Sequence, residues 1–325
     1  MASAHELLVV TLNPALDLSI GLPTLTLGAV NRTQSSQLAA AGKGLNVARV
    51  LAALGHRVTL SGLLGEDNDA PFVAACASAG IADASLRLPG ETRINAKIAE
   101  ADGRVTDING PGLSVSAEAL AALRQRLDTH CRERTPGAVV LTGSLPPGVS
   151  DEDFAALVAA LKATGVPVWV DTSGPALAAA LAVPPSAVKP NEHELAAWAG
   201  APLETREAQR EAARRLHRAG VEEALLSLGG AGLIWVSRRG EWLAEPPRVS
   251  VVNTVGAGDT LVAGMLHGIL ADQPPAQVLG FATALAADAV RHVGVGRPEA
   301  ADFSELLQQT RVQRLDEATY AGESA

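Results

Sequence analysis

The chain has 325 residues, enough for one large α/β domain or two ordinary ones, and 47% of them are apolar. Its formal net charge of −9 argues against a nucleic-acid partner, because phosphate backbones recruit lysine and arginine, but it leaves small phosphorylated ligands open. The two cysteines, Cys76 and Cys131, show no metal-site or disulfide spacing, which is typical of a reducing compartment. The apolar run at 7–12 is too short for a signal peptide or a membrane span. We therefore expect a cytoplasmic protein with no membrane partner.

The first third of the sequence contains two kinds of segment. Apolar runs that end at glycine or at Asn-Pro predict buried strands and helices. Residues 18–38 and 92–110 instead alternate polar and apolar residues around turn signals, which predicts a small separate β-sheet inserted in the chain. Apart from these insertions, we expect a strand at 7–12, a helix at 45–54, a strand at 57–62 and a helix at 71–79.

From about residue 116 the sequence alternates between strand and helix patterns. Such alternation predicts a doubly wound α/β fold, in which helices cover both faces of a mainly parallel sheet to give three α/β/α layers. We expect one such domain over residues 1–300, then a C-terminal helix and a loose tail over 301–325. The predicted strands are at 138–142, 166–171, 186–189 and 223–228, with a hairpin at 232–236 and 242–245; the predicted helices are at 151–164, 175–182, 192–199, 204–219 and 259–291, the last one broken near 273–275.

The run Gly256, Ala257, Gly258 and Asp259 directly precedes a largely apolar helical segment. A glycine-rich turn at a helix start exposes backbone N–H groups at the positive end of the helix dipole, so it predicts an anion site. A carboxylate there would repel a phosphate group that is only bound. The carboxylate fits a site where a phosphoryl group is transferred, because it can take a proton from the attacking hydroxyl. The simpler alternative is a turn in which Asp259 only caps the helix.

Four further polar motifs follow directly after predicted strands. In open α/β sheets, ligands bind outside the carboxyl ends of the strands. Each motif alone could be an ordinary turn, but all of them on one rim, together with Asp259, predict a ligand site there. The four motifs are at 13–17, 143–148, 189–194 and 227–232.

Positive charge occurs at two other places of interest. The Gly-Lys-Gly-Leu-Asn turn at 42–46 opens a helix, and its glycines let the backbone approach a ligand that Lys43 and Asn46 could contact. The alternative is a tight turn with a solvated lysine. Arg93 and Lys97 share one face of a predicted strand, which suits an anionic substrate, although a solvated strand face is the more ordinary interpretation.

Two standard nucleotide-binding signatures are missing from the sequence. It contains no G-x-x-x-x-G-K-[ST] motif, which excludes a P-loop enzyme. Its first strand is not followed by G-x-G-x-x-G, which disfavours a dinucleotide-binding fold and therefore a dehydrogenase.

Three of these motifs, in this order, resemble those of the PfkB carbohydrate kinase family, also called ribokinase-like. Residues 42–46 and 253–259 resemble the two signatures of the family, and Lys-Pro-Asn-Glu-His-Glu-Leu at 189–195 resembles its K-P-N-x-x-E-L stretch. The resemblance extends from the first strand to about residue 297. The segments similar to the 1-phosphofructokinase branch of the family are 11–17, 92–95 and 106–112.

Two residues depart from the commonest family pattern. Asn253 stands where many sugar and nucleoside kinases of the family have Asp, but Asn is usual in the phosphofructokinase branch. Ala41 stands where a glycine usually precedes the Gly-Lys-Gly turn, so the local turn can differ slightly.

The resemblance implies a kinase that uses ATP and Mg²⁺ to phosphorylate fructose 1-phosphate at its 6-hydroxyl, giving fructose 1,6-bisphosphate, with the inserted sheet as a lid over the sugar. Asp259 would be the catalytic base, and the N–H groups of Gly256, Ala257 and Gly258 would form an anion hole. The resemblance assigns the sugar phosphate to Asp17, Gly42, Lys43, Asn46, Arg93 and Asn109; the ATP to Lys189, Asn191, Ser227, Leu228, Gly229, Gly230, Ala231, Gly232 and Gly258; and the Mg²⁺, through water, to Asn191 and Glu194.

Several alternatives remain at this point. A tagatose-6-phosphate kinase or a 6-phosphofructokinase of the same family would carry the same motifs, because these ketose phosphates differ too little for sequence to separate them. A kinase for a neutral sugar would not need Arg93 and Lys97. A catalytically silent sugar-phosphate-binding protein would gain nothing from Asp259. In this family the lid often also makes a dimer contact, so a homodimer is a further expectation.

Overall fold

A computed structural model of the chain describes residues 4–315 and, within them, a main sheet of eleven strands. In sheet order the strands are β15 (Arg311–Arg314), β14 (Gly240–Glu245), β13 (Leu233–Ser237), β12 (Glu223–Ser227), β11 (Ala187–Val188), β10 (Val168–Asp171), β9 (Ala138–Thr142), β1 (Glu6–Thr11), β4 (Arg57–Gly65) and β5 (Ala82–Asp83), with β6 (Leu86–Leu88) paired to β4. All neighbouring strands from β5 to β12 run parallel, and β13, β14 and β15 are added in antiparallel order.

The apolar run at the start of the chain forms β1, which lies between β4 and β9. Side chains alternate between the two faces of a strand. Leu7 and Val9 therefore belong to the core on one face, and Leu8 and Val10 belong to the core on the other. All four are fully buried, as expected for a parallel strand that is covered on both sides.

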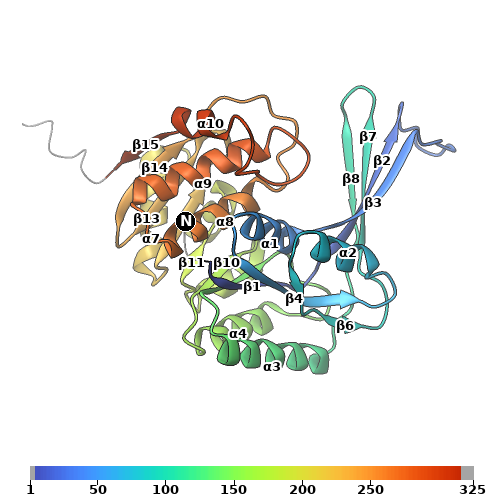
Figure 1. The fold of residues 1–325 in the computed structure, drawn as a ribbon, viewed down its shortest axis with the longest axis horizontal. Coiled ribbons are helices and arrows are strands. Elements are labelled where there is room, and N and C mark those ends of the chain that lie inside the picture. Colours follow the sequence, from blue (N-terminus) through green and yellow to red (C-terminus); the bar gives the residue numbers. More distant parts are fainter. Residues whose placement is uncertain (1–3, 316–325) are drawn as a thin grey trace, which may run out of the picture.

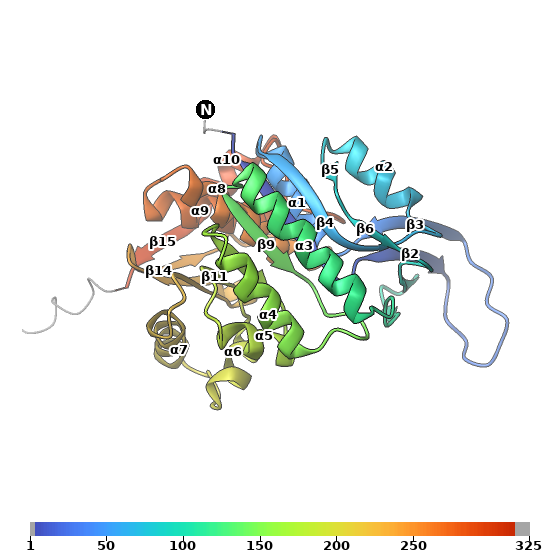
Figure 2. The same cartoon turned by 90° about the horizontal axis from the view of Figure 1, so that it is seen from below.

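Helices cover both faces of this sheet, as Figures 1 and 2 show. The prediction of a three-layer, mainly parallel α/β fold is confirmed. None of the helices within residues 4–315 is long and apolar enough to cross a bilayer. One face carries α1 (Lys43–Ala53), α2 (Ala70–Ser78), α8 (Ala257–Leu270), α9 (Pro275–Ala289) and α10 (Phe303–Gln309); the other carries α3 (Ala117–Arg134), α4 (Asp151–Lys162), α5 (Gly174–Leu181), α6 (Glu192–Ala199) and α7 (Arg206–Arg218).

A second, four-stranded sheet projects from one side of the main body (Figure 1). Its strands, in order, are β3 (Ser35–Ala41), β2 (Ala15–Leu22), β7 (Ile94–Glu100) and β8 (Val105–Asn109). The chain passes from β1 to β2 through Asn13 and Pro14, so the second sheet begins directly at the carboxyl end of the central strand. The small separate sheet expected from the sequence is therefore present, and β2 begins three residues earlier than the start expected at residue 18.

The sequence prediction was wrong in two segments. The C-terminal helix expected within residues 301–325 is limited to α10, and the chain then adds β15 to the edge of the main sheet. Helix α3 was not predicted, because only Leu123, Leu127 and Cys131 form its buried stripe in an otherwise charged segment. The last part of the expected loose tail, from residue 316, lies outside the described residues.

Candidate active site

Helix α8 begins directly after Gly256, which has a φ of 87°. This left-handed conformation favours glycine, and a Cβ at this position would also lie only 2.8 Å from the carbonyl oxygen of Gly294. Thr260 N–H donates to the oxygen of Gly256, and the Ala257 N–H makes only a long contact of 3.4 Å with the carbonyl oxygen of Thr254. The N–H groups of Gly256 and Gly258 have no hydrogen-bond acceptor among the described residues. The glycine-rich turn thus presents its N–H groups where the helix dipole is positive, next to Asp259 in the first turn.

The carboxyl group of Asp259 is 5% exposed and lies against polar groups from distant parts of the chain. Burial raises its pKa to about 6, and the negative charge of Asp171 contributes in the same direction. The side-chain amide of Asn46 donates to its Oδ2 at 2.8 Å and opposes this shift. A carboxylate with a pKa near 6 is ionised at neutral pH and is still basic enough to accept a proton from a hydroxyl group.

A second buried carboxylate, Asp171, lies at the end of β10 and is 2% exposed. Its Oδ2 lies 3.2 Å from Nζ of Lys43, and its Oδ1 lies 3.4 Å from Nζ of Lys189. Burial opposes ionisation of Asp171, but the charges of Lys189 and Lys43 outweigh it and lower its pKa. Asp171 therefore joins the Gly-Lys-Gly turn to the Lys-Pro-Asn stretch.

Sequence reasoning missed Asp171. The available signal was its position as the last residue of a predicted strand, directly before Thr-Ser-Gly, on the same rim as the other polar motifs. Its two lysine partners are far away in the sequence, so only the fold reveals the contacts.

The loop after β1 contacts the loop after β9 on this rim. Asn13 Nδ2 donates to Oγ of Ser144 at 3.2 Å and to the carbonyl of Pro111 at 3.1 Å. A Cβ at Gly112 would lie 2.1 Å from Asn13 Oδ1, so this close approach requires a glycine. Ser144 is exposed at the rim and is a second polar side chain that sequence reasoning did not single out.

Arg93 connects the second sheet to the main sheet. Its guanidinium donates to the carbonyl oxygens of Asn13 at 3.0 Å, Pro14 at 3.2 Å and Gly110 at 3.2 Å. One amino group also lies 3.4 Å from Oγ of Ser144. A guanidinium carries five N–H groups, and these contacts use four of them, so one donor remains available for a ligand on the rim.

Lys97 does not add to the positive charge of Arg93, because it pairs with Asp17. Its Nζ lies 3.2 Å from Asp17 Oδ2, and Asn95 donates to Asp17 Oδ1 at 3.3 Å. Asp17 is thus held by two neighbours on β7. Asn109 lies opposite Asn95 on β8 and is exposed at the end of that strand.

Asn191 and Glu194 contact each other at the start of α6. Asn191 Oδ1 accepts from the Glu194 N–H at 2.9 Å, and Glu194 Oε2 accepts from the Asn191 N–H at 2.8 Å, which is a capping box. The second carboxylate oxygen of Glu194 has no such bond. Since Mg²⁺ keeps several waters and binds through few carboxylates and the substrate phosphates, this site fits a water-mediated Mg²⁺.

The turn after β12 lies beside the Lys-Pro-Asn stretch. Ser227 forms an isolated parallel bridge with Asn191, and its Oγ donates to the Pro190 carbonyl at 3.3 Å. A Cβ at Gly258 would lie 3.2 Å from Nζ of Lys189, so this lysine reaches the glycine-rich turn of α8. Gly229, Gly230 and Ala231 form an exposed single turn beyond the buried Leu228, and Gly232 closes that turn.

Comparisons with known proteins agree with this arrangement. Residues 11–301 match the model of the pfkB family carbohydrate kinases. A 1-phosphofructokinase from Vibrio cholerae is 41% identical over 311 residues, covering 95% of this chain and 97% of the relative. A solved structure of phosphofructokinase-2 from Escherichia coli in complex with potassium aligns with a TM-score of 0.86 at 28% identity, covering 95% of this chain and 99% of the other. The tetrameric inhibited form of that enzyme aligns with a TM-score of 0.85 at 28% identity, covering 94% and 98% of the two chains.

Proposed function

We propose, since this chain belongs to the pfkB family of carbohydrate kinases, that it transfers a phosphoryl group from ATP to the 6-hydroxyl of fructose 1-phosphate and so forms fructose 1,6-bisphosphate. The observation that carries the proposal is the buried carboxylate of Asp259 at the N-terminus of α8. A binding protein would have no use for an acid beside a phosphate site, whereas a phosphotransferase with an alcohol acceptor needs a base there.

Asp259 acts in this proposal as the base that takes the proton of the 6-hydroxyl. Its pKa of about 6 keeps it ionised at neutral pH, and the hydrogen bond from Asn46 fixes the position of one of its oxygens. The hydroxyl becomes a stronger nucleophile as its proton moves to the carboxylate, and it attacks the terminal phosphorus of ATP in line with the leaving ADP.

The phosphoryl group in transfer is stabilised by the start of α8 and by a lysine. The N–H groups of Gly256, Ala257 and Gly258 lie at the positive end of the helix dipole. Lys189 reaches this turn and is held in place by Asp171. Both donors are positioned before the substrate binds, so little reorganisation is needed during the reaction.

The sugar phosphate binds between the rim of the main sheet and the four-stranded sheet. Arg93 has one remaining N–H donor for the 1-phosphate, and the Ser144 hydroxyl, 3.4 Å from the guanidinium, is a further donor. We assign the sugar hydroxyls to five residues, of which Asn46 contacts Asp259 directly. These are Asp17, Gly42, Lys43 and Asn46, with Asn109 at the end of the lid strand β8.

ATP binds in this proposal along the turn after β12. Ser227, Leu228, Gly229, Gly230, Ala231 and Gly232 line its nucleoside part, and Lys189, Asn191 and Gly258 lie nearer to its phosphates. Mg²⁺ is held through water by Glu194 and Asn191, and it neutralises part of the phosphate charge when bound.

The same four-stranded sheet is proposed as the contact between two copies of this chain. Its edge strands carry large apolar side chains that are exposed in the single chain: Leu38 is 44% exposed, Val105 is 59% exposed and Ile108 is 58% exposed. Exposed apolar side chains gathered on one sheet are typical of an interaction surface. The tetrameric relative supports an assembly of more than one chain.

A substrate panel tests the proposed reaction. Purified protein with Mg-ATP is supplied with fructose 1-phosphate, fructose 6-phosphate and tagatose 6-phosphate, and kcat/KM is measured for each. We expect the highest value with fructose 1-phosphate, because the relative with 41% identity carries that activity in its name. A higher kcat/KM with fructose 6-phosphate or tagatose 6-phosphate would replace the substrate assignment. If none of the three sugar phosphates gave a bisphosphate, the proposed function would be refuted.

A further inference from the structure

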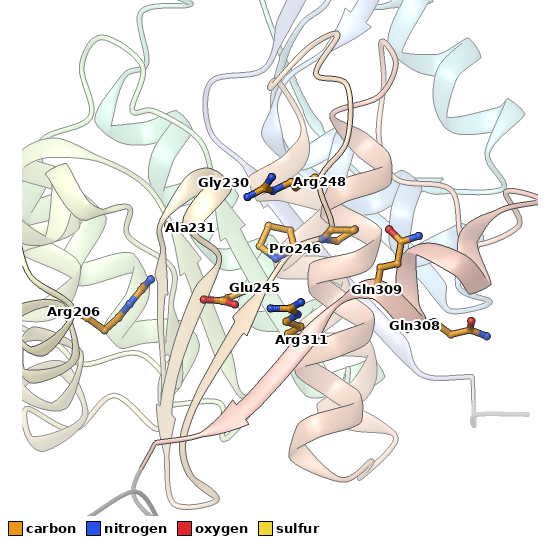
Figure 3. A pocket seen from close by; sticks show the side chains of 10 residues that line it. Arg206, Gly230, Ala231, Glu245, Pro246, Arg248, Gln308, Gln309 and Arg311 are labelled. Carbon is orange, nitrogen blue, oxygen red and sulfur yellow. The ribbon is translucent and has the colours of Figure 1, made fainter.

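A cavity with a volume of about 740 Å³ lies beside the exposed turn at Gly230 and Ala231, and it includes none of the residues around Asp259. Its walls come from separate parts of the chain: the first residue of α7, that turn, residues 245–248 after β14, and the connection between α10 and β15. Figure 3 shows the lining side chains at the open end of the β13–β14 hairpin, where β13 begins and β14 ends. A cavity of this size is large enough for a small organic ligand.

Three arginines line the cavity, Arg206, Arg248 and Arg311, and the single carboxylate among the lining residues is Glu245. None of these arginines forms an ion pair with any acidic residue within residues 4–315; Arg206 contacts only the side-chain oxygen of Gln209, at 3.5 Å. The cavity is therefore a local positive site on a chain whose net charge is −9.

The neighbouring arginines of α7 behave differently. Arg210 and Arg214 both pair with Glu241, so the same helix satisfies its other guanidinium groups within the fold. Arg248 and Arg311 are also exposed to solvent at the cavity wall. Arg311 lies opposite Glu245 in the pairing of β14 with β15 but forms no ion pair with it, and Arg206 donates only to Gln209. Most donors of the three arginines are therefore free for an external anion.

We propose that this cavity binds a small organic phosphate. A guanidinium offers parallel N–H donors that match two oxygens of a phosphate group, and Gln308 adds an amide donor at the same wall. The remaining volume, lined by Pro246 and Pro247, provides apolar surface for the carbon part of the ligand. A bare inorganic phosphate would fill only a small part of this space.

The position of the cavity suggests a consequence that rests on the proposed function. Gly230 and Ala231 line the cavity and also belong to the turn proposed to hold ATP. That turn is tied to β14, because a Cβ at Gly232 would lie 1.8 Å from the carbonyl oxygen of Ala244. A ligand that contacts the turn and the end of β14 together would alter how the turn holds the nucleotide, so the ligand is an effector of ATP binding.

Calorimetric titration with glycerol 3-phosphate tests the binding site itself. The double variant Arg248→Gln/Arg311→Gln should bind this probe at least about tenfold more weakly than the original protein, because two charge-assisted contacts are lost. Arg57→Gln removes another exposed arginine, at the start of β4 and far from the cavity in the order of the sheet, and should leave the affinity unchanged. Equal isotherms for the double variant and the original protein would overturn the proposal.

Two further arms separate this site from the active site and from a site for inorganic phosphate. Arg93→Ala, which weakens the proposed substrate-phosphate contact, should keep the binding that the double variant loses; loss of that binding in Arg93→Ala alone would refute the separate site. Inorganic phosphate should bind more weakly than glycerol 3-phosphate, and equal affinity would refute the assignment to an organic phosphate.

The effector role is measured by the KM for ATP with and without glycerol 3-phosphate. We expect a shift in the original protein that is absent from the double variant. A chain that binds the probe through Arg248 and Arg311 but has no kinase activity would refute the proposed function alone. An active kinase with unaltered probe binding in the double variant would refute the effector site alone.

Discussion

The side-chain amide of Asn46 lies 2.8 Å from a carboxylate oxygen of Asp259, although 213 positions separate the two residues in the sequence. The Gly-Lys-Gly-Leu-Asn turn at 42–46 therefore contacts the glycine-rich turn at 256–259 directly. Asn46, which the sequence resemblance assigned to the sugar, also positions the proposed catalytic base. Two kinds of measurement follow from this contact, one on the rate and one on its pH dependence.

Replacing Asp259 by Asn should lower kcat by about 10²- to 10⁴-fold, the usual range for the loss of a general base. The substitution keeps the shape of the side chain, so the dissociation constant for ATP should remain unchanged. Asp128→Asn, a substitution of a partly exposed acid on α3, serves as the control and should retain full turnover. Near-normal turnover in Asp259→Asn would refute the assignment of the base.

The pH dependence of kcat/KM should show an acid limb near the pKa of Asp259, about 6. The base works only when ionised, so below that pH kcat/KM should fall in inverse proportion to the proton concentration. Asn46→Ala removes the hydrogen bond that lowers this pKa, so the limb should move to higher pH. A limb that stays in place in the variant would show that Asn46 does not tune the base.

Asp171→Asn should move the same limb in the opposite direction. The negative charge of Asp171 raises the pKa of Asp259, and its removal lowers that pKa. The variant also releases Lys43 and Lys189 from their shared partner, so the KM for ATP should rise. A pH–rate profile for each variant checks both effects; shifts in the same direction for Asn46→Ala and Asp171→Asn would contradict this electrostatic account.

Arg93→Ala should raise the KM for the phosphosugar by about tenfold or more, since a hydrogen bond between charged groups is lost, while the KM for ATP stays the same. Arg93 also holds the second sheet through three carbonyl oxygens, so Arg93→Lys, which keeps the charge but not the fork of donors, is a matched comparison. An equal rise in both KM values would count against Arg93 as the phosphate anchor.

Acid should destabilise the protein through a histidine cluster on the α1 and α8 side of the sheet. His56 Nδ1 accepts from the backbone N–H of His5 at 3.3 Å, and its Nε2 lies 2.9 Å from Nδ1 of His267. Burial, and then the neighbouring His267 and His5, lower the pKa of His56 to about 4. The unfolded chain therefore binds more protons between about pH 6.5 and pH 4, and stability is lost as the pH falls through that window.

Thermal unfolding between pH 8 and pH 4 measures this effect. We expect Tm to fall more steeply below pH 6.5 in the original protein than in His56→Asn, which cannot gain the proton. Parallel curves for the two proteins would mean that other groups cause the loss.

The parts of the fold that could be predicted from the sequence are those set by local patterns. The apolar run of β1 and the glycine turn before α8 determine their own conformations through burial and positive φ. Strand β15 could not be predicted, because Arg311 to Arg314 are mostly exposed and become a strand only by pairing with β14. The spacing of Asn191 and Glu194 also fits a capping box, but the two residues were interpreted only as ligand-binding residues, Asn191 for ATP and both for Mg²⁺.

Within the candidate site, Lys43, Lys189 and Asp259 could be found from the sequence because each stands beside a glycine or a proline in a recognisable motif. Asp171 and Ser144 belong to ordinary strand ends, and their importance comes from contacts with Lys43, Lys189 and Asn13. Lys97 was interpreted as a free cation because its partner Asp17 is on another strand. Long-range pairing of charges depends on sheet register, which one sequence does not reveal.

The contact between α1 and α8 has a consequence for the synthesis of the chain on the ribosome. Leu45, Val47, Leu51 and the neighbouring apolar residues of α1 are fully buried in a core that α8 and α9 complete. A nascent chain that ends before residue 257 can form β1, β4 and α1, but it leaves that face of α1 in water. The growing polypeptide therefore exposes an apolar face of α1 until α8 has been synthesised, and the contact between Asn46 and Asp259 can form only after residue 259 has been added.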